Sequence, residues 1–322
     1  MQRPGSTKNT LDTGSRTEIN LNDHHRYVSI TMEFRCNLRC VHCMIEGTMH
    51  RLKPSNDENF DAVLQIQREE KKWDGLILTG SEITLLRTLP DLAKKARHAG
   101  FKHIRIQTHG MHLSRVDYVN RLIDAGIDEF FISVAGHDAK THDQITEVKG
   151  SFDRMMRGIE YLDSRNHPVK IITNTVVTRL SYRSLSEIVQ LFAPYNAVVQ
   201  NEFWNFFPMS EDDPKSLIVP YPELMPYINA AIEECYKLGK GIEVKNVPRC
   251  LLGPWKRALV NAQPTLHIDP EFWTEFDKNE FYQCPHRSAC SALDCLGLTT
   301  AYIRNYGNEI ALLKPLKQDE LD

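Results

Sequence analysis

The chain has 322 residues, and 39 lysines and arginines against 42 aspartates and glutamates give it a formal net charge of −3. Hydrophobic residues make up 41% of the chain and charged residues 25%, which is ordinary for a globular protein and excludes wholesale disorder. A net charge so close to zero provides no global field for nucleic acid, and no apolar run is long enough to span a membrane, so we expect neither partner.

The beginning of the chain is polar and lacks the apolar segment of a secretory signal, so we expect residues 1–25 to form a flexible leader. Without export the chain stays in the cytoplasm, a reducing compartment in which disulfides are rare. Its eight cysteines therefore point to metal or redox chemistry. They gather in two groups, one near the start of the chain and one near its end.

Strands and helices alternate along residues 26–208. Short apolar or β-branched runs predict strands, and longer segments with helical periodicity predict helices. We expect strands at residues 26–33, 75–79, 103–107, 129–134, 169–177 and 197–207, and helices at residues 59–72, 85–99, 115–125, 151–164 and 184–192. This repeat implies an α/β fold with a parallel sheet and helices outside it, either an incomplete barrel or an open sheet.

The alternation stops after Pro208. Residues 210–220 have the composition of a linker, and residues 221–238 predict one further helix, which ends at Gly239. The rest of the chain is irregular and contains prolines and cysteines. We therefore expect a second, small module at residues 209–322.

Three cysteines follow the first expected strand directly, in the pattern Cys36-x3-Cys40-x2-Cys43. Three thiolates on one short loop can ligate three irons of a 4Fe–4S cube and leave the fourth iron open for a substrate or cofactor. The alternative is a structural zinc site, in which His42 or His50 would supply the fourth ligand. The position after the first strand of a β/α repeat favours an active site over a structural one.

The segment FRCNLRCVHC resembles the cluster loop of the radical S-adenosylmethionine (radical SAM) superfamily, with His42 in the usually aromatic position before the last cysteine. The resemblance covers about residues 26–208 and implies a partial (β/α)6 barrel. It also implies that Cys36, Cys40 and Cys43 hold a 4Fe–4S cluster whose open iron binds S-adenosylmethionine. Reductive cleavage would then give a 5′-deoxyadenosyl radical that abstracts a hydrogen atom from the substrate.

The second expected strand ends in Thr79-Gly80-Ser81-Glu82, which resembles the GGE segment of the superfamily. The resemblance implies that Gly80, Ser81 and Glu82 hold the methionine amino group of S-adenosylmethionine, since backbone carbonyls and a carboxylate suit an ammonium group. A plain strand-to-helix turn is the alternative interpretation of this segment.

Polar residues also end the next three expected strands. Thr108 and His109, in the sequence QTHG, resemble the TNG-like segment near the ribose. Ser133 and Asn174 stand where the superfamily places polar contacts to the ribose and the methionine carboxylate. Each of these residues would equally suit a buried position satisfied by the backbone, and only their location at the carboxyl ends of strands favours cofactor binding.

Several other residues have ordinary structural explanations. Glu202 and Trp204 lie near the end of the last expected strand, where an aromatic-rich strand is more often core than pocket. Tyr302 and Tyr306 stand four residues apart, which on a helix usually means packing. His24 is too close to the N-terminus for an interpretation.

The second cysteine group follows the pattern Cys284-x5-Cys290-x4-Cys295. Together with Cys250 it is large enough for a second, fully ligated 4Fe–4S cluster, and the region resembles the SPASM or twitch modules that follow many radical SAM barrels. The alternatives are a zinc site that includes His286, or reduced structural cysteines.

Cys250 has two competing roles. It is either the fourth ligand of the second cluster or a hydrogen-atom donor at the barrel mouth, because a placed thiol can quench a carbon radical and so invert that carbon. The surrounding VPRCLLG loosely resembles the corresponding part of radical SAM aminoglycoside epimerases. Cys235, in an expected helix, is assigned to packing.

The sequence therefore predicts a radical SAM enzyme that acts on a small biosynthetic substrate, a sugar or an aminoglycoside, by epimerisation or dehydrogenation. Its electrons would come from a reductant such as flavodoxin or ferredoxin. Modification of a ribosomally made peptide is the second hypothesis. A metal-stabilised binding protein without catalysis is the third.

Overall fold

The computed structural model describes residues 23–165 and 168–321. Of the expected leader, residues 1–22 lie outside the described part of the chain, so the expectation of flexibility is not tested there. A short 3-10 turn, His24–Arg26, leads directly into the first strand.

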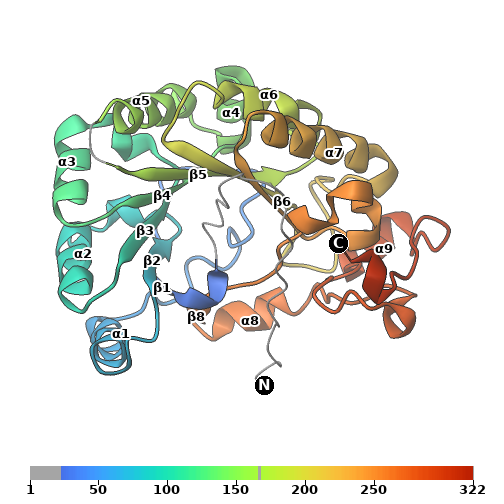
Figure 1. The fold of residues 1–322 in the computed structure, drawn as a ribbon, viewed down its shortest axis with the longest axis horizontal. Helices are drawn as coiled ribbons and strands as arrows, with labels where there is room; N and C mark the ends of the chain where they lie inside the picture. The colour runs from blue at the N-terminus through green and yellow to red at the C-terminus, as the bar shows by residue number, and fades with distance from the viewer. Residues whose placement is uncertain (1–22, 166–167, 322) are drawn as a thin grey trace.

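Parallel strands form one sheet in the order β7-β6-β5-β4-β3-β2-β1-β8, and this sheet is not closed into a full barrel. The strands are β1 (Tyr27–Glu33), β2 (Gly75–Gly80), β3 (His103–Thr108), β4 (Glu129–Ser133), β5 (Lys170–Val177), β6 (Val198–Asn205), β7 (Gly241–Lys245) and β8 (Thr265–His267). The helices are α1 (Asp57–Glu70), α2 (Leu89–His98), α3 (Val116–Asp124), α4 (Ala139–Thr146), α5 (Ser151–Asp163), α6 (Leu185–Leu191), α7 (Tyr221–Lys237), α8 (Glu271–Phe276) and α9 (Thr300–Tyr306). Helices cover the outside of the curved sheet (Figure 1), so the expected α/β architecture of a partial barrel is confirmed.

Local sequence explains where the helices begin. The side chain of Asn56 accepts from the amide of Asn59, and the side chain of Asn59 accepts from the amide of Asn56, so α1 starts two residues before its expected position. In the same way Asp138 accepts from the amide of Thr141 and starts α4, a helix that the sequence analysis did not predict. The cap of α4 matters for the site because α4 contacts the cysteine loop.

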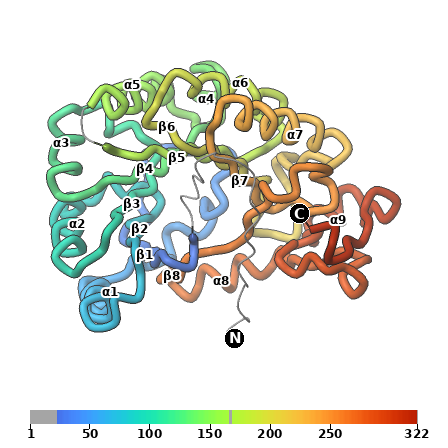
Figure 2. The backbone as a smooth tube through the Cα atoms, in the orientation of Figure 1, coloured from blue at the N-terminus to red at the C-terminus, as the bar shows by residue number. Residues whose placement is uncertain are grey.

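Two strands come from beyond residue 208. β7 pairs with β6, and β8 pairs with β1 at the opposite edge of the sheet. Figure 2 shows β7 and β8 at the two ends of the sheet, with α8 and α9 following along the chain. Part of the expected module at residues 209–322 therefore belongs to the sheet itself. β8 could not be predicted, because a three-residue strand has no periodicity to detect.

Alternation along the strands separates the core from the inner face of the sheet. On β1, Val28 and Ile30 are fully buried within the main hydrophobic cluster that fills the space under the helices. Their neighbours Ser29 and Thr31 point to the other face and line a cavity. Burying each large apolar side chain contributes about 1.5–3 kcal/mol. The outer face therefore stabilises the fold and leaves the inner face available for polar side chains.

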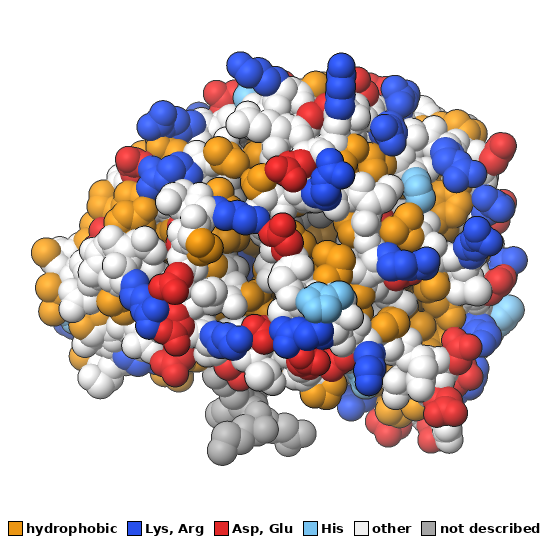
Figure 3. Space-filling view, turned by 180° about the vertical axis from the view of Figure 1, so that it is seen from behind, with side chains coloured by type: hydrophobic (Ala, Val, Ile, Leu, Met, Phe, Trp, Pro, Cys, Tyr) orange, Lys and Arg blue, Asp and Glu red, His pale blue; other side chains and the backbone are white. Residues whose placement is uncertain are grey.

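The face of the molecule seen in Figure 3 carries no large region of one charge. On the face seen in Figure 3, lysines and arginines are mixed with aspartates and glutamates. Within residues 23–165 and 168–321, no helix combines the length and the apolar character that crossing a membrane would require.

Candidate functional site

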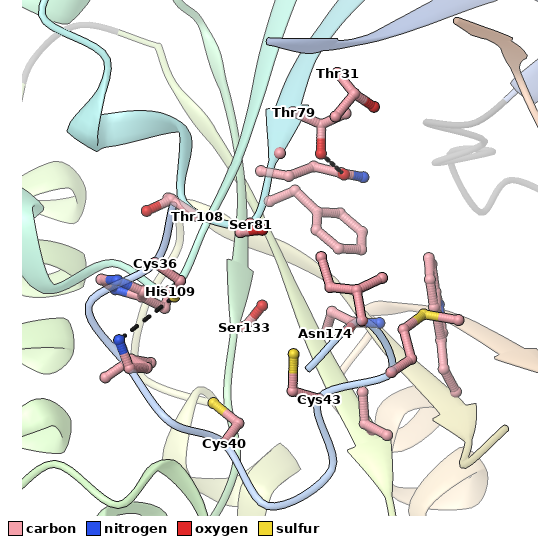
Figure 4. A pocket seen from close by; sticks show the side chains of 18 of the residues that line it. Thr31, Cys36, Cys40, Cys43, Thr79, Ser81, Thr108, His109, Ser133 and Asn174 are labelled. Atoms are coloured by element: carbon pink, nitrogen blue, oxygen red, sulfur yellow. Dashed lines mark hydrogen bonds between the residues drawn. The ribbon is translucent and has the colours of Figure 1, made fainter. Parts of the chain in front are cut away.

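The inner face of the sheet surrounds a cavity of about 690 Å³, a volume typical of ligand sites. Side chains at alternate positions of the strands form its wall, and residues 263–268 close one side. The loop after β1 closes another side, and it brings Cys36, Cys40 and Cys43 to the cavity (Figure 4). This is the carboxyl-end face of the strands, where barrel enzymes carry their active sites.

Contacts from distant parts of the chain hold the cysteine loop. The amides of Arg39 and Val41 donate to the carbonyls of Thr146 and Ile145 at the end of α4, over 3.1 and 2.9 Å. On the other side, Lys215 Nζ donates to the Val41 carbonyl at 3.0 Å. Tertiary contacts therefore shape the loop together with its own turns, such as the bond from the Cys43 amide to the Cys40 carbonyl at 3.0 Å.

The three thiols of the loop are free and half-buried, and Figure 4 shows Cys40 and Cys43 pointing from the loop into the cavity. Burial raises the pKa of Cys36 to about 11 and that of Cys40 to about 12, and the nearby thiols of Cys43 and Cys36 add to the rise at Cys40. The thiols thus lie within electrostatic reach of one another. The amide of Leu38 donates to Cys36 Sγ at 3.4 Å, a contact that stabilises a thiolate.

β2 ends closely against β1 at Gly80. A Cβ added at Gly80 would lie 2.0 Å from the carbonyl oxygen of Glu33, so a larger residue would push the two strands apart. The amide of Ser81 donates to the same carbonyl at 2.8 Å, while its hydroxyl oxygen is buried and has no partner among the described residues. Because an unpaired buried hydroxyl costs free energy, Ser81 Oγ is a natural contact for a ligand in the cavity.

The side chain of Glu82 is fully buried and does not line the cavity. Its carboxylate accepts from Thr108 Oγ1 at 2.7 Å and from the amides of Thr84 and His109, each at 2.9 Å. It therefore binds the ends of β2 and β3 together behind the cavity wall. The predicted contact of this carboxylate with the methionine amino group draws no support from this geometry, whereas Gly80 and Ser81 do face the cavity.

The four polar residues expected at the next strand ends all line the cavity. Ser133 and Asn174 are neighbours in the register of β4 and β5. Asn174 is 6% exposed, and its Nδ2 finds no acceptor among the described residues. An amide nitrogen in that position suits a carboxylate or hydroxyl oxygen of a ligand. Thr108 and His109, in contrast, have their polar atoms engaged within the protein.

Several residues of the cavity wall were not predicted from the sequence. Arg105, Lys245 and His24 line the cavity. Glu202 and Trp204 also line it, although their place on an aromatic-rich strand favoured the core. Burial raises the pKa of Glu202, although its carboxylate accepts from Trp204 Nε1 at 2.8 Å. The available signal was a charged residue at an alternate position of an otherwise apolar strand, which marks the inner face.

The second cysteine group gathers away from the cavity. Cys250 does not line the cavity, and burial raises its pKa, with the nearby thiols of Cys295, Cys284 and Cys290 adding to the rise. The four thiols therefore lie within electrostatic reach of one another, and none forms a disulfide. Of the two roles considered for Cys250, this arrangement favours the ligand over the hydrogen-atom donor.

Backbone amides point at the sulfurs of this second group. The amide of Arg249 donates to Cys295 Sγ at 3.4 Å, and the amide of Leu316 donates to Cys290 Sγ at 3.3 Å. Such N–H donors stabilise thiolates and tune iron–sulfur clusters. His286 lies in the same region with its Nε2 buried and unpaired within the described structure. No three possible ligands in the described residues converge as they would around one zinc ion, so the zinc alternative draws no support from this geometry.

The donor set of the first cysteine loop fits a cluster with an organic cofactor beside it. In the described ranges, no three histidine, cysteine or acidic side chains converge as they would around one metal ion. A 4Fe–4S cube spreads its thiolates around a larger group. The three free thiols, together with the unpartnered Ser81 Oγ and Asn174 Nδ2, provide soft ligands and polar contacts on one cavity wall.

Residues 30–192, about half of the chain, match the family model of the radical SAM superfamily. The chain belongs to this superfamily. Its members use a 4Fe–4S cluster and S-adenosylmethionine, so the expected family and cofactors are confirmed. The assignment of individual residues to these cofactors stays a prediction from the motifs and the geometry.

The curated relatives of this radical SAM chain are named for more than one reaction. A probable GTP 3′,8-cyclase of Methanopyrus kandleri is 28% identical over 242 residues, which cover 69% of this chain and 73% of that protein. An AdoMet-dependent heme synthase of Methanosarcina barkeri is 28% identical over 183 residues, which cover 56% of this chain and 50% of that protein. The chain spans only about half the length of the heme synthase and of several further relatives.

Solved structures share the fold. The structure of anSMEcpe with bound AdoMet has a TM-score of 0.54 and 15% identity, covering 68% of this chain and 63% of that chain. The structure of SuiB from Streptococcus suis bound to the precursor peptide SuiA has a TM-score of 0.54 and 16% identity. The match covers 73% of this chain and 52% of that chain. None of the four proteins named here is an aminoglycoside epimerase, so the weaker resemblance to that group gains no support.

Proposed function

We propose that the chain removes a hydrogen atom from an organic substrate bound in the cavity and converts it to a dehydrogenated product. The observation that carries this proposal is the meeting, in one cavity, of three free thiols with unpaired polar groups at strand ends. When bound there, a 4Fe–4S cluster and S-adenosylmethionine supply a carbon radical that can break an unactivated C–H bond. Cys36, Cys40 and Cys43 would hold the cluster.

The strand ends would orient the cofactor. The turn at Gly80 and Ser81 offers backbone groups and a free hydroxyl to the methionine amino group. Asn174 offers an unpaired amide to the carboxylate or the ribose, and Ser133 lies beside it. These roles are the ones that the motif resemblance implies, and the unpaired atoms support them.

Apolar side chains at the cavity protect a reactive species from water. Phe34, Met44, Leu266 and Phe272 line the cavity, and they come from the cysteine loop region and from the segment around β8 and α8. Excluding water limits side reactions of a radical once it has formed. The two segments are joined by ion pairs of Arg51 with the carboxylates of α8.

The place of Cys250 supports dehydrogenation over epimerisation. In the described part of the chain, the cysteines that line the cavity are the three of the loop, so a separate thiol donor is absent from that wall. Dehydrogenation removes a second electron and a proton after the hydrogen atom, and so needs a one-electron acceptor. Four grouped thiols with amide donors are a suitable donor set for a second cluster, which would supply that redox chemistry.

A small polar molecule is the first candidate substrate. The inner wall presents Arg105, Gln107, Glu202 and Lys245, which suit polar recognition at close range. One relative is named for a reaction of GTP, itself a small molecule. A sugar or aminoglycoside gains no support from the relatives. A peptide is the second candidate, and the shared fold with SuiB, solved with its precursor peptide, favours it.

Reconstitution of the protein without oxygen tests the proposal. The protein with iron, sulfide, S-adenosylmethionine and a reductant should form 5′-deoxyadenosine. Cys36→Ala should abolish this product, whereas Cys235→Ala, which changes a buried cysteine packed within α7, should retain it. If the reconstituted protein leaves S-adenosylmethionine intact, the proposed function is wrong.

A second variant tests the role of Cys250. If Cys250 is a ligand, Cys250→Ala should lower the iron content from about eight to about four per chain, while 5′-deoxyadenosine still forms. If it is a hydrogen-atom donor instead, the iron content should stay unchanged and only the final product should change.

A further inference from the structure

The ring of His109 bridges the end of β3 to the cysteine loop. Its Nε2 lies 2.7 Å from Oδ1 of Asn37, the residue next to Cys36, and 3.0 Å from Oε2 of Glu82 at the end of β2. The His109 side chain is only 6% exposed and Glu82 is fully buried, whereas Asn37 is exposed, so the bond to Asn37 is partly shielded from water. One ring therefore touches three separate parts of the site.

The contacts of the ring fix its tautomer. The amide of Met111 donates to Nδ1 of His109 at 3.2 Å, so Nδ1 is an acceptor and the proton sits on Nε2. Burial lowers the pKa of His109, which favours the neutral ring. The single Nε2–H is then shared between the oxygens of Asn37 and Glu82.

The loop has a second anchor on its other half. The amides of Arg39 and Val41 bind the end of α4, whereas Asn37 binds His109, so the two anchors lie on opposite sides of Leu38. Loss of the α4 anchor would free the half near Cys43. Loss of the His109 anchor would free the half near Cys36.

We propose that His109 is a positioning residue that ties the cysteine loop to the ends of β2 and β3, and so sets the place of Cys36 relative to the Gly80–Ser81 turn before any cofactor binds. The proposal rests on the proposed function only for the identity of the bound group. The anchoring itself is a property of the metal-free chain and is testable there.

Two substitutions distinguish the loss of the hydrogen bond from the loss of side-chain volume. Glutamine places its amide nitrogen about as far from the backbone as histidine places Nε2, whereas the nitrogen of asparagine stops one carbon short. His109→Gln should therefore keep the bridge to Asn37, and His109→Asn should lose it. His112→Asn is the matched control, because His112 lies three residues further on and contacts Thr84 instead of the loop.

The first measurement is amide hydrogen exchange in the metal-free protein. In His109→Asn, the amides of residues 36–38 should exchange about tenfold faster than in the wild type, the size expected for the loss of one partly buried hydrogen bond. The amides of residues 39–43 should change less, because the α4 anchor remains. His109→Gln and His112→Asn should stay within about threefold of the wild type. Thermal unfolding followed by circular dichroism verifies that all three variants are folded.

The second measurement uses the reconstituted protein and electron paramagnetic resonance of the reduced cluster. Adding S-adenosylmethionine should change the spectrum, and His109→Asn should need about ten times more cofactor for half of that change, while His109→Gln restores the wild-type response.

Unchanged exchange in His109→Asn, or equal losses in both His109 variants, would overturn the anchoring role. If the wild type does not cleave S-adenosylmethionine but the exchange pattern appears as expected, the proposed function fails and the anchoring role of His109 stands.

Discussion

Acidification should destabilise the chain through His142. This side chain of α4 is 1% exposed, and burial lowers its pKa from 6.5 to about 4. Its Nδ1 accepts a hydrogen bond from the amide of Ala135 at 3.2 Å, which requires that nitrogen to be unprotonated. Unfolding exposes the imidazole and returns its pKa to the ordinary value near 6.5.

The sign and size of the effect follow from proton binding. Below about pH 6.5 the unfolded state binds a proton that the folded state does not, so the free energy of unfolding falls as the pH falls. The contribution of neutral His142 to the free energy of unfolding is fully present above pH 6.5, its pKa in the unfolded state. It is lost as the pH falls to about 4, its pKa in the folded state. The drop in the His142 pKa from 6.5 to about 4 corresponds to about 3 kcal/mol. That is a large part of the about 5–15 kcal/mol that stabilises a typical domain.

Urea denaturation of the metal-free protein, followed by circular dichroism between about pH 7 and about pH 4, measures this loss. His142→Gln keeps an acceptor for the Ala135 amide but cannot titrate, so its stability should fall less steeply than that of the wild type. His98→Gln changes an exposed histidine of α2 and serves as the control. Parallel curves for the wild type and His142→Gln would refute the reasoning, because the remaining acidic and basic groups are common to both proteins.

Three further substitutions test the site and its support. Gly80→Ala should lower the free energy of unfolding by about 1–3 kcal/mol and weaken cofactor binding, because the new Cβ would meet the carbonyl of Glu33; unchanged urea midpoints would contradict this. Tyr302→Phe should cost about 1–3 kcal/mol, since the amide of Tyr221 loses the hydroxyl that it contacts at 2.8 Å, and equal stability would show that water replaces the hydroxyl. Asn174→Ala should leave urea stability within about 1 kcal/mol but raise the KM for S-adenosylmethionine about tenfold, because its amide nitrogen has no partner in the described structure; an unchanged KM would remove Asn174 from the cofactor site.

The sequence could predict what is encoded locally. The strands β1 to β6 are short apolar or β-branched runs, so their positions were predictable to within a few residues. The spacing of Cys36, Cys40 and Cys43 is likewise local, and it indicated the superfamily that the family model confirms. Even the fact that Ser133 and Asn174 would share one cavity followed from their places at the ends of parallel strands.

The sequence by itself thus determined the order of the first six strands, the superfamily and the loop that carries the first three thiols. Only the tertiary structure decided that Glu82 turns behind the cavity wall, that Cys250 joins the cysteines near the C-terminus, and that β7 and β8 extend the sheet. Each of these depends on contacts between segments far apart in the chain, such as β1 with β8. Periodicity and motif spacing describe neighbours along the chain, so they carry no information on which distant segments pack together.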